Sequence, residues 1–416
     1  MRTVEEHFAR IRAAAVAPEP VRVPIIEARG FVCAEEVVAR RPLPGFDQAS
    51  VDGYAVRSID VAEAGPDFKG QFGQPADFSM PVVGESRTGS RQIPRLQPKQ
   101  AVRIESGAPL PALADAVVPV EDTDSDKVKV KIFRPIRQGA NIRSAGDDVR
   151  VGDVAVAKGT TIGSAHVGLL AAVGKTDILV YPRPRVAVLA VGTELVDIHT
   201  TPDAGQVYDV NTYALASAID EAGGEASRVG IVEPRADTIR STVADQLGKC
   251  DILIVTGGVG GRSSDVVQEA LLNFGNIEIS RVAMHPGGVQ GFGRLGTRNV
   301  PTFLLPELTS SALVVFEVMV RPLIRELRGF ERFARHRVSA ITVNDFLSDP
   351  DTTGFVRGKL MRTSRGEYRV RALGAAGTEN RLVHSADANC LIVVEPNVTH
   401  IGAGETVSVE FLAQRG

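Results

Sequence analysis

The chain has 416 residues, of which 44% are hydrophobic and 23% charged, and its formal net charge is −3 at pH 7. A chain of this length exceeds what one hydrophobic core usually supports, so we expect more than one domain. The nearly balanced charge, the absence of tryptophan and an aromatic content of 5% argue against a nucleic-acid-binding protein. No apolar run approaches the roughly 20 residues of a membrane-spanning helix. We therefore expect a cytoplasmic protein that does not insert directly into a membrane.

The three cysteines, Cys33, Cys250 and Cys390, lie far apart in the sequence, and none belongs to a CxxC pair. This spacing fits neither a zinc site nor a disulfide framework. We expect three buried thiols in a reducing compartment.

The N-terminal region predicts a helix followed by a β-rich insertion. Thr3 and Glu6 have the spacing of a capping box, and the helix is expected to extend to Ala15 with an apolar stripe that includes Phe8. From residue 60 to about residue 131, short extended pieces are interrupted by glycine and proline, which is typical of a small β-rich domain.

Between residues 181 and 329, strands alternate with helices that begin at capping residues, which predicts a parallel sheet covered on both faces. The predicted strands are Val186–Val191, Asp251–Val255 and Phe303–Leu305. The predicted helices are Thr212–Ala222 capped by Asn211, Thr238–Leu247 capped by Asp237, and a long helix from about Ser311 to Leu327.

Past Phe330 the helical period ends, and short strands predict a terminal β-barrel or sandwich. These strands are Val338–Val343, Tyr368–Leu373, Cys390–Val394 and Thr406–Phe411.

A glycine-rich loop follows the second strand of the α/β region. Gly257, Gly258, Gly260 and Gly261 come directly after that strand, and a helical pattern begins after Asp265. A strand, a glycine turn and a helix start present backbone N–H groups and a helix dipole to an anionic ligand. Glycine at such a turn can equally serve only to pack the helix on the sheet, and the loop alone leaves both interpretations open.

Several motifs in this order resemble the molybdopterin molybdenumtransferase family, which includes bacterial MoeA and the E domain of gephyrin. The motifs are FDQASVDGYAVR (46–57), RIESGAPLPALADAVVPVE (103–121), NIRSAGDD (141–148), VGTEL (191–195), GQVYDVN (205–211) and TGGVG (256–260). The resemblance covers essentially the whole chain. It implies a multidomain α/β plus β fold and an elongated homodimer, with a three-layer α/β molybdopterin-binding-like domain and a C-terminal β-barrel. The implied subdomains are residues 1–45 and 146–180 for dimerisation, 46–145 for the β-rich insertion, 181–329 for the α/β domain and 330–416 for the barrel.

In this family, adenylylated molybdopterin and molybdate bind between the α/β domain and the DGYA-bearing segment of the dimer partner, and Mg²⁺ assists hydrolysis of the adenylyl group. The resemblance implies catalytic carboxylates at Asp52, Asp148, Glu194 and Asp265, with Mg²⁺ contacts from Asp52 and Glu194. It implies cofactor contacts from Gly257, Gly258, Gly260, Ser263, His285 and Pro306. Each acid also has a structural interpretation, in which the first three stabilise turns or loops and Asp265 caps a helix.

The chain departs from the family motifs at the expected oxyanion site. The GGxSxG loop becomes GGVGGR, with Gly260 at the serine position and Arg262 at a glycine position. KPGKP becomes HPGGV, so His285 and Gly288 replace two lysines, and LPGNPVS becomes LPELTSS, which introduces Glu307. A charge-assisted hydrogen bond contributes ~1.5–3 kcal/mol, so losing both lysines would weaken oxyanion binding by roughly two to four powers of ten. We therefore expect molybdenum insertion to be weak or lost.

The E domain of gephyrin also binds an unstructured receptor segment, and matching its groove to this chain implies partner contacts from Glu5, Phe8, Phe355 and Pro396. These residues have a structural interpretation as well, with both phenylalanines in cores and the proline ending a strand.

Our main hypothesis is a homodimeric cytoplasmic scaffold that needs no cofactor and binds a short peptide of a partner protein. Resemblance to the divergent bacterial gephyrin-like branch suggests the C-terminal tail of the division protein FtsZ as that peptide, with recruitment to the division site or to a membrane receptor. The alternative is an active transferase that uses Mg²⁺, molybdate and adenylylated molybdopterin.

Overall fold

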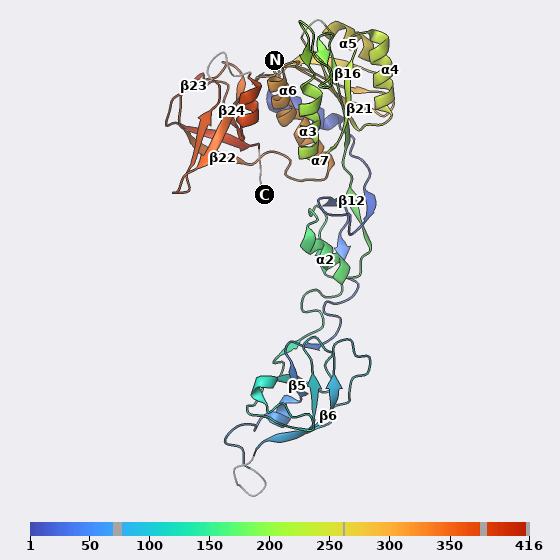
Figure 1. Ribbon diagram of the computed structural model, residues 1–416, viewed down its shortest axis with the longest axis vertical. Helices are drawn as coiled ribbons and strands as arrows, with labels where there is room; N and C mark the ends of the chain where they lie inside the picture. Colours follow the sequence, from blue (N-terminus) through green and yellow to red (C-terminus); the bar gives the residue numbers. More distant parts are fainter. Residues whose placement is uncertain (70–76, 261–262, 375–380, 413–416) are drawn as a thin grey trace. The chain divides into compact units, whose positions relative to one another are not determined.

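The computed structural model describes residues 1–69, 77–260, 263–374 and 381–412. The chain divides into two compact units, Met1–Val21 with Leu179–Gly416, and Arg22–Ile178 (Figure 1). Each unit has hydrophobic cores of its own. The three cysteines are buried thiols, as expected. No helix in the described ranges is long and apolar enough to cross a membrane.

The unit Arg22–Ile178 contains a five-stranded sheet in the order β8–β5–β7–β6–β9, which agrees with the β-rich region expected from the sequence. Tyr54 and Met80 are among the buried side chains of its core. The strands of this sheet are β5 Gly53–Val56, β6 Ser79–Ser86, β7 Ala101–Ile104, β8 Ala116–Pro119 and β9 Lys129–Lys131. The other elements of the region are β1 Val21–Pro24, β2 Val32–Cys33, β3 Val37–Val38, β4 Gln48–Ala49, β10 Ile142–Arg143, β11 Val154–Val156, α2 Ser164–Ala172 and β12 Asp177–Tyr181.

The other unit contains a six-stranded sheet in the order β16–β13–β17–β21–β20–β18. Its strands are β13 Arg185–Val191, β16 Glu225–Val232, β17 Ile252–Thr256, β18 Ile277–Arg281, β20 Val289–Leu295 and β21 Val300–Leu305. The first four strands of the order are parallel to one another, whereas β20 is antiparallel to both of its neighbours, β21 and β18. The prediction of a wholly parallel sheet is therefore wrong at one edge. The reason is a tight turn in which the N–H of Asn299 donates to the carbonyl of Gly296, joining β20 to β21 as a hairpin.

Helices cover both faces of this sheet, because alternate residues of its central strands point to opposite sides. Val186 and Val188 of β13 pack in the core that includes helices α3 and α6, whereas Ala187 and Leu189 pack in the core that includes α4 and α5. The helices are α3 Asn211–Ala222, α4 Ala236–Leu247, α5 Ser264–Leu271, α6 Thr309–Val315 and α7 Arg321–Leu327, with a π-helical turn at Phe316–Val320 between the last two.

Two of the predicted helix caps are wrong. Asn211 is the first residue of α3, and the carboxylate of Asp209 instead accepts a hydrogen bond of 3.0 Å from the N–H of Thr212. Asp237 lies within the first turn of α4 rather than at its cap. Both errors arise because a capping pattern in the sequence does not distinguish neighbouring polar residues that differ only in backbone conformation.

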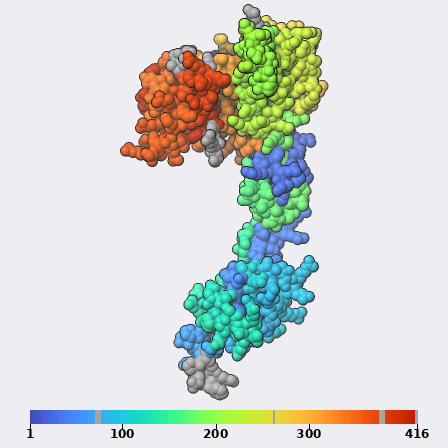
Figure 2. All heavy atoms as spheres, viewed as in Figure 1, coloured from blue at the N-terminus to red at the C-terminus, as the bar shows by residue number. Residues whose placement is uncertain are grey.

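The C-terminal strands form a closed sheet in the order β19–β24–β25–β22–β28–β26, with β24 pairing to β26, so the β-barrel prediction is confirmed. Figure 2 shows these residues, coloured orange to red, as a rounded body. The strand that the sequence analysis missed is β24, Thr353–Arg362, which pairs with both β25 and β26. The remaining strands are β19 Met284–His285, β22 Arg337–Thr342, β25 Tyr368–Ala372, β26 Cys390–Val394 and β28 Thr406–Phe411.

Helix α1, Val4–Ala14, begins with the predicted capping box between Thr3 and Glu6. The expected stripe faces the core, with Ile11 buried and Phe8 half-buried against it, but the inward face also includes the buried His7. His7 is 1% exposed, and neither of its ring nitrogens has a hydrogen-bond partner among the described residues. Burial, together with Arg2 and Arg10, lowers the pKa of His7 to about 4.

We expect His7→Leu to stabilise the protein by ~1 kcal/mol near neutral pH, because it removes an unpaired buried polar group while keeping the side-chain volume. The folded-state pKa lies below the ordinary 6.5. The unfolded chain therefore takes up the proton first, and wild-type stability should fall as the pH drops from about 6.5 towards 4. Thermal unfolding at neutral and mildly acidic pH should show a larger advantage of the variant in acid. The exposed His199→Leu is the control, and a lower melting temperature of His7→Leu at both pH values would contradict this account.

Candidate functional site

The carboxyl ends of three parallel strands meet at one edge of the six-stranded sheet. β13 is in register with β17 up to the pair Ala190–Thr256, and β17 is in register with β21 up to the pair Thr256–Leu305. The loops that follow these strands therefore lie side by side, which is where ligands bind in open α/β sheets. We call residues 192–194, 257–260 and 306–308 the strand-end loops.

The first and third strand-end loops bring two carboxylates near each other. The side chain of Glu194 folds back over its own loop, since a Cβ added at Gly192 would lie 2.5 Å from Glu194 Oε1. Partial burial and the nearby Glu194 carboxylate both raise the pKa of Glu307. Helix α3 holds the backbone of Glu307, because Asn211 Nδ2 donates a hydrogen bond to the Glu307 carbonyl oxygen at 2.6 Å. The motif comparison placed Glu307 at the expected oxyanion site, and in the structure it lies near Glu194.

The same residues fit a Mg²⁺ ion. Mg²⁺ takes oxygen ligands, retains several waters and is commonly held by one or two carboxylates. Asn211 Oδ1 is buried and has no hydrogen-bond partner in the described part of the chain, so an oxygen acceptor beside Glu307 is left over. Glu194, Glu307 and this amide oxygen provide the donor chemistry. No group of three or more His, Cys, Asp or Glu side chains with metal-site geometry occurs among the described residues, so such an ion would rely on waters as well.

The glycine-rich loop has the packing role that the sequence left open, and its ligand-binding role stays a prediction. Gly257 has φ +90°, and a Cβ there would lie 2.2 Å from the carbonyl oxygen of Val191. A Cβ at Gly258 would press on Val267 and Leu304, so these two glycines permit close packing of strand, loop and helix. Gly260 has φ +78° with open space around its missing Cβ, which leaves backbone accessible to a ligand. Gly261 and Arg262 lie outside the described residues.

Ser263, Asp265 and Pro306, which were also predicted to contact substrate or cofactor, form no side-chain hydrogen bond or ion pair with Glu194 or Glu307 in the described part of the chain. Ser263 precedes α5 and makes no capping hydrogen bond with its side chain. Asp265 is exposed in the first turn of α5, so its interpretation as the N-cap is wrong. Pro306 is half-buried directly after β21.

Asp52 and Asp148 belong to the unit Arg22–Ile178, whereas Glu194 and Asp265 belong to the other unit. Asp52 Oδ1 accepts a hydrogen bond of 2.7 Å from the N–H of Ser106, which joins two turns of the β-rich region. Asp148 is exposed and ion-paired with Arg143. Each therefore has the structural role that its sequence context allowed, and their catalytic roles stay predictions.

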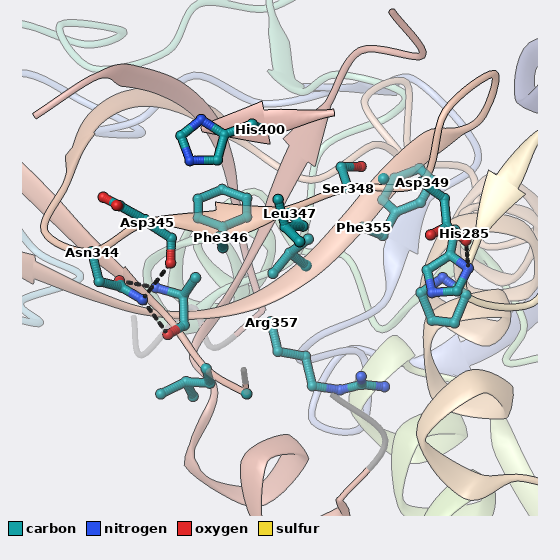
Figure 3. A pocket seen from close by; sticks show the side chains of 16 residues that line it. His285, Asn344, Asp345, Phe346, Leu347, Ser348, Asp349, Phe355, Arg357 and His400 are labelled. Carbon is teal, nitrogen blue, oxygen red and sulfur yellow. Dashed lines mark hydrogen bonds and ion pairs between the residues drawn. The ribbon is translucent and has the colours of Figure 1, made fainter. Parts of the chain in front are cut away.

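A pocket of about 530 Å³ lies between the segment around His285 and the barrel strands (Figure 3). His285 Nδ1 lies 2.7 Å from Asp349 Oδ2. The pocket wall also includes Phe355 and Arg357 of β24 and the exposed His400. The structure thus brings together His285, predicted to bind cofactor, and Phe355, predicted to bind a peptide.

Arg357 is the functional candidate that the sequence analysis missed. It is only 6% exposed, and its Nη2 donates to the carbonyl oxygen of Ser310 at the start of α6. Burial lowers the pKa of Arg357 to about 10, which still leaves the guanidinium charged at neutral pH. The signal was present as an arginine two residues after Phe355, on the same face of a strand. This signal was not recognised because strand β24 was not predicted from the sequence.

The four residues predicted to contact a peptide differ in their exposure to solvent. Phe355 is 3% exposed and packs in the same core against which Phe8 lies, so its ring is not an exposed anchor. The Phe8 ring lies 5.8 Å from that of Phe333. Glu5 is exposed and Pro396 is half-buried. The expectation that Phe355 offers its ring to a peptide is corrected by this burial, and peptide binding itself stays a prediction.

Gly257→Ala should destabilise the protein by more than about 3 kcal/mol, because the added methyl collides with a backbone carbonyl and the residue must keep a positive φ. Gly260→Ala is the matched control, and its open surroundings predict a loss of only about 1 kcal/mol from the backbone conformation. Thermal unfolding of both variants measures the difference. Equal losses would show that the loop relaxes away from Val191.

Three family models match the chain in sequence. They are the MoeA N-terminal region (domain I and II) over residues 2–174, a probable molybdopterin binding domain over residues 187–326, and the MoeA C-terminal region (domain IV) over residues 339–412. Together they cover both units described above.

Curated relatives and solved structures agree with these models. Molybdopterin molybdenumtransferase 1 of Mycobacterium tuberculosis is 53% identical over 426 aligned residues that cover 100% of both chains. Molybdopterin molybdenumtransferase 2 of the same organism is 33% identical, over 98% of this chain and 99% of the relative. The crystal structure of a molybdopterin biosynthesis MoeA protein from Pyrococcus horikoshii superposes with a TM-score of 0.85 at 25% identity, covering 99% of each chain. The chain therefore belongs to the MoeA family.

Proposed function

We propose that this protein is a molybdopterin molybdenumtransferase, which inserts molybdenum from molybdate into molybdopterin during molybdenum cofactor biosynthesis. The observation that carries this proposal is the 53% identity, along the full length of both chains, to a relative with that name. This is the alternative that the sequence analysis ranked second. The scaffold hypothesis gains no support from the comparisons or from the burial of Phe355.

The pocket of Figure 3 weakens the argument that the oxyanion site has lost its cations. Two lysine positions of the family motif are held by His285 and Gly288 in this chain, which removes two cations. Arg357 is a buried arginine that lines the same pocket as His285, and its guanidinium donates to the Ser310 carbonyl. A charged donor in a partly desolvated pocket attracts an oxyanion more strongly than an exposed lysine does. We therefore assign molybdate, the substrate, to the Arg357 pocket.

The strand-end loops would handle the molybdopterin end of the reaction. The backbone at Gly260 is open to a ligand, and an N–H group there would suit a phosphate oxygen. Glu194 and Glu307 would hold Mg²⁺ together with Asn211 Oδ1, and that ion would neutralise charge on an adenylyl phosphate. Burial and the Glu194 carboxylate raise the pKa of Glu307, and a bound cation would offset both effects. Helix α6 links the two regions, since Glu307 precedes it and Ser310 contacts Arg357.

Replacing Glu194 or Arg357 should impair molybdenum insertion by different routes. Glu194→Gln should lower the rate about 100-fold and weaken Mg²⁺ dependence, because one of two carboxylates is neutralised. Arg357→Met should raise the molybdate concentration needed for half-maximal rate by roughly 10- to 100-fold, which corresponds to loss of one charge-assisted contact. The measurements are restoration of molybdoenzyme activity in a strain lacking the family enzyme, and insertion by the purified protein.

Arg362→Met is the control for the arginine variant, because Arg362 is exposed on the same strand β24. It should behave as wild type. If the well-expressed wild-type chain restores no activity and inserts no molybdenum, the proposed function is wrong. If Arg357→Met alone behaves as wild type, only the assignment of molybdate to this pocket is wrong.

A further inference from the structure

The segment that carries Glu194 is held in place by very little backbone structure. After Glu194 the chain forms β14, Leu195–Val196, and returns as β15, Val207–Tyr208, before α3 begins. These two-residue strands are joined in parallel, with the N–H of Val207 donating to the Glu194 carbonyl at 2.8 Å. The N–H of Asp209 donates to the Val196 carbonyl at 2.9 Å. So short a ladder cannot by itself fix the acids of the site.

A single arginine on the neighbouring strand β16 supplies the missing side-chain contacts. Arg228 Nη2 donates to Asp197 Oδ2 at 2.8 Å, directly after β14. Arg228 Nη1 lies 3.7 Å from Asp209 Oδ2, directly after β15. Because β14 and β15 are parallel, their carboxyl ends lie together, and one guanidinium reaches the carboxylate that follows each strand.

Helix α3 completes this arrangement and orients the guanidinium. The centre of the Arg228 guanidinium lies 3.8 Å from the centroid of the Tyr213 ring. Its Nη2 donates to the Tyr213 hydroxyl at 2.6 Å, and its Nη1 donates to Thr212 Oγ1 at 3.4 Å. Arg228 is thereby held by a cation–π contact with the Tyr213 ring and by hydrogen bonds to two side chains of α3.

The charge balance shows why this residue matters. Asp209 is 1% exposed, and a buried carboxylate is costly unless it is paired and hydrogen-bonded. The other contacts of Asp209 come from Thr212, whose N–H and hydroxyl both donate to it. Removal of Arg228 would leave Asp209 without its cation, and the segment 195–209 could then relax towards water.

We propose that Arg228 is a positioning residue for the candidate site: through Asp197 and Asp209 it clamps the segment between Glu194 and Asn211. Arg228 does not touch the strand-end loops, so it acts only through the segment that it holds. Glu194 lies at the start of that segment, and Asn211, which bonds the Glu307 carbonyl, lies at its end. This inference rests on the proposed function for its catalytic consequence, but not for the clamp itself.

The test measures amide hydrogen exchange and molybdenum insertion on the full chain. In Arg228→Met, amides of residues 195–209 should exchange about 10-fold faster, whereas those of β17 should not change. Insertion should slow by roughly 10- to 100-fold through kcat, with little change in the KM for molybdate. Arg228→Lys should recover part of the protection and part of the rate, because an ammonium can pair with one carboxylate but lacks the planar fork.

Asp197→Asn is the second variant in case Arg228→Met does not fold, since it breaks the half-buried pair with Asp197 and leaves Asp209 paired. It should give a smaller change of the same kind. Arg240→Met, at a half-buried helix arginine paired with the exposed Asp237, is the control and should change neither measurement. Unchanged exchange of residues 195–209 in the Arg228 and Asp197 variants would overturn the clamp. Faster exchange with unchanged insertion would overturn the positioning role. Absence of insertion by the wild type would contradict the proposed function, and the exchange experiment would then decide the clamp alone.

Discussion

The parallel register of β13, β17 and β21 is the constraint on which the candidate site depends. It places the residues after Val191, Thr256 and Leu305 at one edge of the sheet, although they come from distant parts of the sequence. A shift of one residue in any of these strands would exchange the two buried faces, because side chains alternate. The register is held by cores on both faces, so the position of the loops follows from packing rather than from the loops' own residues.

The site divides its charges between two neighbouring regions. The strand-end loops are acidic, with the Glu194 carboxylate close enough to raise the pKa of Glu307. The pocket beside the barrel contains Arg357 and the His285–Asp349 pair. Carboxylates suit a cation and a guanidinium suits an oxyanion, so the two regions have the complementary chemistry that joining a metal oxyanion to a phosphorylated cofactor requires.

Helix α6 and the segment before α3 connect these regions mechanically. The helix follows Glu307 directly and accepts a hydrogen bond from Arg357 through the carbonyl of Ser310. Asn211 ties the Glu307 backbone to α3, and Arg228 ties the segment before α3 to strand β16. The acids are therefore supported by rigid elements behind the loops, as pre-organised electrostatic sites require.

Much of the architecture followed from local patterns in the sequence. Hydrophobic periodicity located α1, the α/β alternation and most barrel strands, and the capping box at Thr3 was recognised because it depends on neighbours only. The family and the positions of Glu194 and Glu307 after their strands were also accessible, since each belongs to a contiguous motif.

Only the tertiary structure decided the antiparallel edge strands, the inward orientation of His7, the burial of Phe355 and the presence of Arg357 in the pocket. These features depend on which surface packs against an element, and a one-dimensional pattern does not contain that information. A count of cations made from the motif left Arg357 out for this reason: the lysine positions lie in one contiguous motif, whereas Arg357 comes from a strand of the barrel.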